Sequence, residues 1–193
     1  CVSFDAPSQA MVRLIYSRNR AISLTLAHLY LKNGLRRLNL AEIITPLEIP
    51  GDILTQIYGE ARHSFPSECC GWLSGPAQGT AATTLRRCDN AQEAGGAGAI
   101  EGRTAERAYV IDGNDLLELN RSLDSDTPAL IIYHSHPNGG AYFSPTDREV
   151  ATSPWGDGPA YPVQQLVVGI TEERVVEAAL FAWSDNESGF IEI

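Results

Sequence analysis

Long apolar runs are missing from this chain of 193 residues. No apolar stretch reaches the roughly 18–20 residues that a helix needs to cross a bilayer, so we expect no membrane partner. Hydrophobic residues make up 44% of the chain and charged residues 20%, which are ordinary values for a globular protein. The length fits one domain with a sizeable core and an appendage.

Cysteine is also scarce. The chain has four cysteines, and two of them are adjacent, which is not the dense pattern of a secreted disulfide scaffold. We therefore expect a reducing compartment, the cytoplasm. No C-x-x-C spacing occurs, which argues against a cysteine zinc site and against a zinc nucleobase deaminase. Cys70 is interpreted as a small buried residue.

Basic side chains are few and unevenly placed. The formal net charge is −10, and residues 1–45 contain six basic and two acidic residues while the remainder contains eight and 22. An acidic body argues against nucleic acid as a partner, because the phosphate backbone requires a basic surface. The first residue is Cys1 and the only methionine is Met11, so we expect a fragment or a processed chain.

Residues 1–45 are interpreted as a basic extension of unknown role. The pattern allows a short strand over residues 11–16 and a helix over residues 21–38, but it contains no site chemistry. The segment is too short for a core of its own. We expect a packing or dimerisation element; the sequence leaves the oligomeric state open.

The remaining body, residues 46–193, predicts a mixture of helices and strands. The apolar run Ala129–Tyr133 is typical of a buried central strand and leads directly into His134. No regular β-α-β alternation appears, so an α+β fold follows, a three-layer sheet with flanking helices. We expect helices over residues 51–63 and 114–123, a short one opening at residues 144–147, and strands over residues 68–75, 83–88, 108–111, 129–133, 164–169 and 175–183.

Residues 91–105 are rich in glycine and other small residues, and poor in large apolar groups. This composition predicts a mobile loop that does not pack firmly.

Two histidines stand at the end of the predicted central strand. His134 and His136 are two residues apart, so their side chains project from the same face. Asp147 follows after a glycine-rich turn, and the intervening loop is long enough to return a carboxylate to the histidine pair. Two nitrogens and one oxygen suit Zn²⁺ and leave a fourth position for water, the pattern of a catalytic zinc site. Zinc lowers the pKa of bound water from 15.7 to about 7, and a carboxylate base serves this chemistry well.

The segments Glu68-Cys-Cys-Gly71 and His134-Ser-His-Pro137, followed by Ser144-Pro-Thr-Asp147, resemble the motif of the JAMM (MPN-plus, Mov34-type) zinc metalloproteases. Every element of that motif is present at the family spacing, and the resemblance extends over about three quarters of the chain. It implies a stand-alone member of bacterial type. The implied fold is a mixed, mostly antiparallel sheet flanked by helices, like the fold of cytidine deaminases.

The resemblance also implies roles for individual residues. His134, His136 and Asp147 would bind one zinc ion per chain, Glu68 would be the general base, and Ser144 would hydrogen-bond the developing oxyanion or the water. The implied activity is cleavage after the C-terminal Gly-Gly of a ubiquitin-like protein, here a sulfur carrier. The loop 91–105 falls where the family often has a substrate-gripping insertion. We expect it to order with substrate, and unchanged hydrogen exchange would count against this.

Structural alternatives exist for several of these residues. Ser144, with proline and an acidic residue after it, is also an ordinary helix start, and both roles are compatible. Sequence alone gives Glu68 little distinction from a surface strand residue. The rival to an enzyme is a catalytically inactive scaffold, which the retained ligands disfavour. Trp72, Trp155 and Trp183 are interpreted as core or groove residues.

Overall fold

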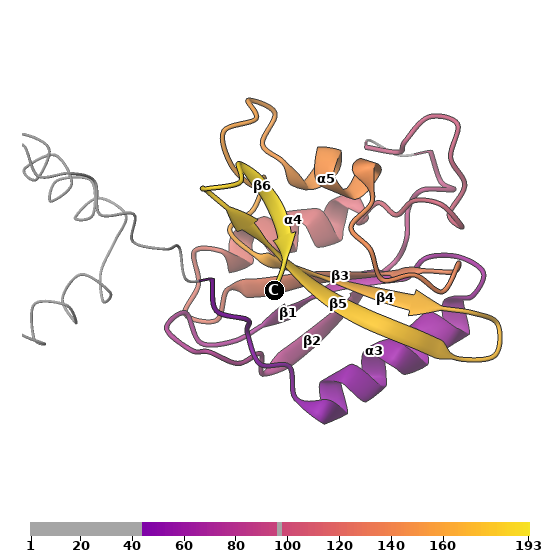
Figure 1. Cartoon of the computed structure of the whole chain (residues 1–193), viewed down its shortest axis with the longest axis horizontal. Coiled ribbons are helices and arrows are strands. Elements are labelled where there is room, and N and C mark those ends of the chain that lie inside the picture. Colours follow the sequence, from indigo (N-terminus) through magenta and orange to yellow (C-terminus); the bar gives the residue numbers. More distant parts are fainter. Residues whose placement is uncertain (1–43, 96–97) are drawn as a thin grey trace, which may run out of the picture. The chain divides into compact units, whose positions relative to one another are not determined.

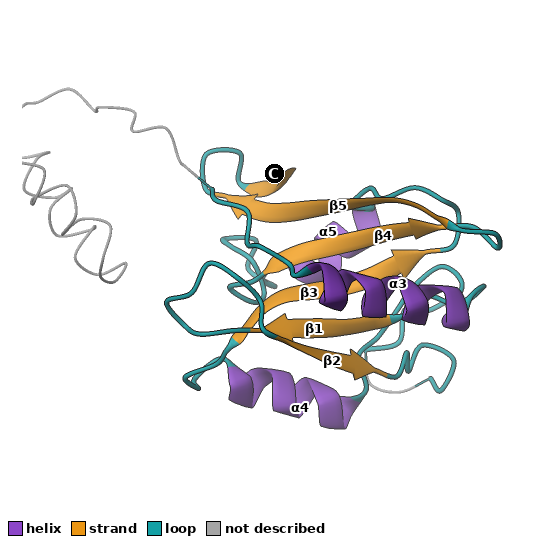
Figure 2. Cartoon of the chain, turned by 90° about the horizontal axis from the view of Figure 1, so that it is seen from below, coloured by secondary structure: helices purple, strands orange, loops and turns teal. Residues whose placement is uncertain are grey.

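The fold is a six-stranded sheet with helices on both faces, as Figures 1 and 2 show. It comes from a computed structural model that describes residues 44–95 and 98–193. The strand order is β2-β1-β3-β4-β5-β6, and the β3–β4 pair is parallel while the other pairs are antiparallel. The predicted α+β class is confirmed.

The elements, in chain order, are α3 (Gly51–Ser64), β1 (Cys70–Ser74), β2 (Thr84–Cys88), α4 (Gly113–Ser122), β3 (Ala129–His136), α5 (Pro145–Ala151), β4 (Gln164–Ile170), β5 (Val175–Ser184) and β6 (Gly189–Glu192).

Helix α3 covers one face of the sheet. It begins after Pro50, and its residues Ile53, Ile57 and Ala61 recur at helical spacing and are buried against the sheet. Burying each of the two isoleucine side chains contributes roughly 1.5–3 kcal/mol. The predicted helix over residues 51–63 is confirmed and ends one residue later.

Helices α4 and α5 lie on the opposite face (Figure 1). The Asp112 side chain accepts a hydrogen bond from the backbone N–H of Asn114 at 2.9 Å and so caps α4. Leu119 of α4 is fully buried with Trp72 and Ile132 of the sheet. The site described below lies on this face.

Strand β3 is central and lies between β1 and β4. Because strand side chains alternate, Ile131 and Tyr133 join the core under α3, whereas Ile132 joins the core under α4. His134 and His136 continue the second set. The strand is buried on both faces, which explains its nearly unbroken apolar sequence.

Three details differ from the sequence predictions. Residues 108–111 form no strand, and only Ile111 makes an isolated bridge, to Asn90. Strand β6 was not predicted, because its four residues include a glycine and are too few to show alternation. Trp155 is neither core nor groove, since it is 85% exposed, whereas Trp72 is buried.

The predicted extension falls almost wholly outside the described residues, so its strand, its helix and the proposed domain boundary stay predictions. From Thr45 onward the chain is attached to the sheet through Gln164, which binds the Thr45 carbonyl at 2.8 Å and the Leu47 N–H at 3.0 Å. Within the described residues, no helix has the length and apolar character to cross a membrane.

Candidate metal centre

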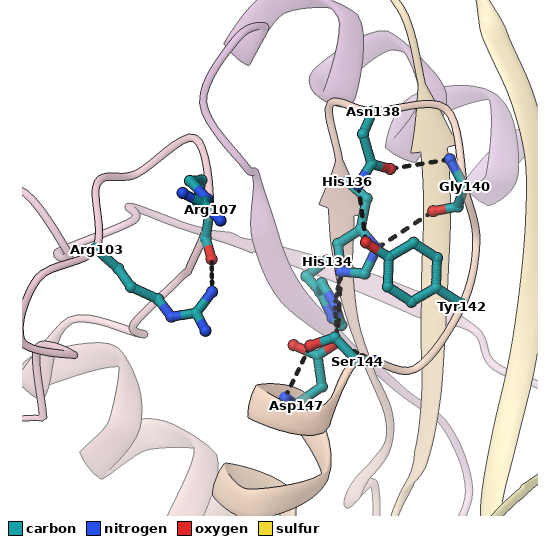
Figure 3. Close-up of polar contacts among 9 residues, drawn as sticks. All are labelled: Arg103, Arg107, His134, His136, Asn138, Gly140, Tyr142, Ser144 and Asp147. Atoms are coloured by element: carbon teal, nitrogen blue, oxygen red, sulfur yellow. Dashed lines mark hydrogen bonds and ion pairs between the residues drawn. The ribbon is translucent and has the colours of Figure 1, made fainter.

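The structure brings His134, His136 and Asp147 together at the end of β3 (Figure 3). The two Nε2 atoms are 3.1 Å apart, and Oδ2 of Asp147 lies 3.5 Å from Nε2 of His134 and 3.4 Å from Nε2 of His136. Both histidines are buried. Three atoms that can each offer a lone pair therefore converge on one small volume.

The carboxylate reaches the histidines because α5 begins at this point. Ser144 is the N-cap: its hydroxyl accepts from the Asp147 N–H at 3.2 Å, and its own N–H donates to Oδ2 of Asp147 at 2.7 Å. Pro145 follows at the first helical position. This reciprocal capping box holds the Asp147 carboxylate in place. Ser144 is thus the helix N-cap that its sequence context also predicts. Its hydroxyl hydrogen has no acceptor among the described residues and can be donated.

The ring of His136 is oriented by a backbone carbonyl. Its Nδ1 lies 3.2 Å from the carbonyl oxygen of Gly140, and a carbonyl can only accept, so Nδ1 carries the hydrogen. In the neutral ring, Nε2 then has a free lone pair directed at His134 and Asp147. This orientation by an outer hydrogen bond is common among metal-binding histidines. The donor set therefore fits a divalent cation of the zinc type.

His134 is held in a different way. It is fully buried, and the ring of Tyr109 stacks on it with centroids 4.6 Å apart and an interplanar angle of 23°. Its Nδ1 has no hydrogen-bond partner within the described part of the chain. Apolar contact, rather than a polar outer partner, positions this ring.

The electrostatics of the group agree with its geometry. Burial lowers the pKa of His134, which favours the neutral ring that a metal requires. Burial acts in the same direction on His136, but the hydrogen bond and charge of Asp147, the charge of Glu68 and the Gly140 carbonyl together outweigh it and raise the pKa of that ring. Burial opposes ionisation of Asp147, yet the two imidazoles hold the pKa of this carboxyl well below its ordinary value. The carboxylate is therefore ionised and ready to bind a cation.

Glu68 lies just before β1, is 5% exposed, and is fixed through its backbone. Its N–H donates to the Ala105 carbonyl at 2.7 Å, and its carbonyl accepts from the Asn90 side chain at 3.0 Å. Burial raises the pKa of Glu68 to about 7, with opposing contributions from His136 and Asp147. Glu68 is thus no surface residue, and its carboxyl can gain and lose a proton near neutral pH.

Sequence reasoning missed two residues that support Glu68. The Ser135 hydroxyl accepts from the Cys69 N–H at 2.9 Å, which joins β3 to the residue after Glu68. The Asn90 side-chain nitrogen donates to the backbone carbonyls of Glu68 and Ala108, and its Oδ1 accepts from the Val110 N–H. The alternation of β3 indicates only that Ser135 lies opposite the histidines. No local signal identifies Asn90.

The described parts of the loop 91–105 are held by several side-chain hydrogen bonds, and the predicted mobility of the loop stays a prediction. Gln92 is 5% exposed; its amide nitrogen donates to the carbonyls of Ile100 and Arg103, and its amide oxygen accepts from the Ile100 N–H. Glu93 accepts from the Ala105 N–H at 2.8 Å. Polar side chains thus organise this loop where apolar ones are lacking.

Comparison with known proteins identifies a family and several relatives. The family model for prokaryotic homologues of the JAB domain matches residues 50–182. Proteins named CysO-cysteine peptidase from Mycobacterium tuberculosis and Mycobacterium bovis are 30% identical over 109 residues, which cover 56% of this chain and 67% of theirs.

Two solution structures share the fold. A protein from Desulfitobacterium hafniense superposes with a TM-score of 0.55 at 17% identity, covering 76% of this chain and 89% of its own. A protein from Salinibacter ruber gives a TM-score of 0.50 at 24% identity, covering 76% and 88%. At these identities the two likenesses speak for the fold alone.

Proposed function

Because the chain belongs to the family of prokaryotic homologues of the JAB domain, we propose that it is a zinc-dependent peptidase acting on the C-terminal tail of a ubiquitin-like sulfur-carrier protein. The bond cleaved is the amide after the Gly-Gly end of that tail. The observation that carries this proposal is the convergence of His134, His136 and Asp147, whose Nε2, Nε2 and Oδ2 atoms lie within 3.5 Å of one another. The buried carboxyl of Glu68 interacts electrostatically with the same group.

The three side chains would hold the zinc ion, and Glu68 would move the proton. When bound, zinc supplies Lewis-acid chemistry, acidifying a water and polarising the scissile carbonyl. Glu68 takes the proton from the attacking water and delivers it to the departing nitrogen. The C–N bond breaks, and the products are a carboxylate on the carrier and a free amine. A pKa near neutrality suits a group that must both accept and release this proton.

Ser144 is assigned the role of hydrogen-bond donor to the oxyanion. Its oxygen already accepts from the Asp147 N–H, so its one hydrogen is free to donate to the negative charge that develops on the carbonyl oxygen. The cap also fixes the position of the hydroxyl, and a preorganised donor stabilises the transition state more effectively than a mobile one.

The relatives' name supports a small leaving group. That name, CysO-cysteine peptidase, contains a single amino acid, cysteine, as its second element. By analogy, we propose that this chain removes a C-terminal residue and exposes Gly-Gly. An extended tail would bind beside the sheet by strand addition, and the loop 91–105 would contact it. The Ala105 carbonyl at the end of this loop already binds the N–H of Glu68, which couples the loop to the proposed base.

The deciding experiment uses the full chain and a set of ubiquitin-like proteins whose Gly-Gly end is extended by one residue. The expected result is loss of that residue, read as an intact-protein mass, with activity abolished by a chelator and restored by zinc. Substrates with the last glycine replaced by valine serve as matched controls. Zinc-loaded protein that leaves every extended carrier unchanged would refute the substrate class.

A further inference from the structure

The turn between β3 and α5 is held by the side chain of one exposed residue, Asn138 (Figure 3). Its Oδ1 accepts from the N–H of Gly140 at 3.0 Å, and its Nδ2 donates to the hydroxyl of Tyr142 at 2.8 Å. Both ends of the amide are therefore engaged. The carbonyl of Gly140, in turn, is the acceptor for Nδ1 of His136.

The base of this turn is fixed independently by its neighbours. Gly139 has a φ of 85°, in the left-handed region that favours glycine, and its N–H donates to the Ile170 carbonyl at 3.0 Å. A Cβ at Gly169 would lie 2.3 Å from the Gly139 carbonyl oxygen, so the turn lies directly on the end of β4. This contact places the turn. The peptide whose carbonyl faces His136 is held at its other end, where the Ala141 N–H donates to Oε1 of Glu177 at 2.7 Å.

We propose that Asn138 is a positioning residue for the metal, acting on the orientation of His136 through the position of Gly140 and through the ring of Tyr142. The inference rests on the proposed function, because it assumes that His136 binds zinc through Nε2. The Asx turn closed by Oδ1 fixes the peptide between Gly139 and Gly140, and thus the position from which the Gly140 carbonyl extends to His136. That carbonyl keeps the hydrogen on Nδ1, which leaves the Nε2 lone pair facing His134 and Asp147.

The second bond of Asn138 strengthens the same arrangement. Tyr142 is 48% exposed, and its ring lies beside His136 with centroids 4.9 Å apart. The bond from Nδ2 to the tyrosine hydroxyl holds this exposed ring against the imidazole. Asn138 therefore restrains the ring of His136 from two sides, through a carbonyl at Nδ1 and through an aromatic neighbour.

The test compares zinc affinity, by competition with a chromophoric chelator, among variants of the full chain. Asn138→Ala is expected to weaken zinc binding about tenfold, the lower end of the roughly 10- to 100-fold cost of losing an outer-shell partner, because the Gly140 carbonyl itself remains. Asn138→Gly removes the same amide but tolerates any turn conformation, so it replaces the alanine variant if that variant fails to fold. Asn138→Asp should restore binding to within a few-fold of the parent, because it keeps the acceptor for Gly140 and can accept from the Tyr142 hydroxyl.

A spectroscopic readout separates positioning from general destabilisation. Absorption bands of the cobalt-substituted protein report the ligand geometry, and they should shift in Asn138→Ala and Asn138→Gly but not in Asn138→Asp. Asn114→Ala, a change at an exposed asparagine on α4, is the matched control and should leave affinity and spectrum as in the parent.

Two results would overturn the inference: parental affinity and spectrum in Asn138→Ala or Asn138→Gly, or an aspartate variant as weak as these. In either case the parent protein would still bind zinc and cleave its substrate, so the proposed function would stand. A parent that binds no zinc would instead refute the proposed function, and the positioning role with it.

Discussion

The two faces of β3 contain opposite kinds of side chain. Toward α3, Ile131 and Tyr133 are fully buried in an apolar core, and the Tyr133 hydroxyl donates to Glu60 at 2.6 Å. Toward α5, His134 and His136 direct lone pairs at Asp147, and three such atoms repel one another unless a proton or a cation lies among them. One face of the strand thus stabilises the fold, and the other gathers the groups for chemistry.

The two faces of β3 can be altered independently by substitution. Alternation along a strand separates the two faces completely, so substitutions on one face should affect stability and those on the other should affect metal binding and turnover. Substitutions paired across the sheet test this separation.

The largest effect is expected for His136→Ala. Removal of a ligand should lower zinc content far below one ion per chain and reduce turnover by more than the roughly 10- to 100-fold cost of an outer-shell change. Metal analysis of the purified variant measures this. His63→Ala changes an exposed histidine on α3 and should leave the zinc content unaltered. Full zinc occupancy in His136→Ala would remove this residue from the ligand set.

Glu68→Gln should lower turnover by about 10²- to 10⁴-fold, the usual contribution of a general base, while zinc binding is retained. Steady-state kinetics and metal analysis on the same sample separate the two properties. The matched control is Glu60→Gln, which changes a mostly buried glutamate on the opposite face and should keep its turnover. Equal turnover in the two variants would contradict the role of Glu68.

Ile131→Ala should show the reverse behaviour. Truncating this fully buried side chain is expected to reduce the free energy of unfolding by about 2–5 kcal/mol, through lost burial and the cavity left behind. Urea unfolding measures the loss, and zinc affinity of the folded protein should stay at the parental value. A large drop in affinity would show that the two faces are coupled.

The smallest effect is a pH dependence of turnover. A general base works only when deprotonated, so the rate should fall as pH decreases through the pKa of Glu68, by about tenfold per unit well below it. Burial raises this pKa to about 7 in the metal-free protein, and a bound cation lowers it, so the acid limb should be centred at or below neutrality. The profile of kcat/KM reports it. The residual activity of Glu68→Gln should lack this limb, and an identical limb would assign the titration to another group.

Much of the fold could be predicted from local patterns. The spacing of Ile53, Ile57 and Ala61 predicted α3, and the apolar run from Ala129 predicted β3, because both patterns follow from backbone geometry. Residues 108–111 had strand-forming composition, but within this segment only Ile111 forms a β-bridge, and a strand requires a neighbouring strand along its length. Similarly, the order around Gln92 depends on carbonyls 8 and 11 residues away.

The residues of the site also differ in how far the sequence predicts them. The two-residue spacing of the histidines predicts that they share a face, whereas Glu68 drew attention only through the family resemblance. Asn138 precedes two glycines, which is typical of a turn, and its link to His136 emerges only from its contacts with Gly140 and Tyr142.

By itself, the sequence determined which side chains point the same way along each element, because periods of 2 and 3.6 residues are properties of the backbone. Tertiary structure alone decided which elements meet. The pairing of β1 with β3 brings Glu68 into the electrostatic environment of the histidines. The turn that packs on β4 directs the chain back, so that Asp147 at the start of α5 reaches the histidines. Such meetings depend on strand order and loop closure, which are set by the packing of the whole domain and leave no periodic trace in the chain.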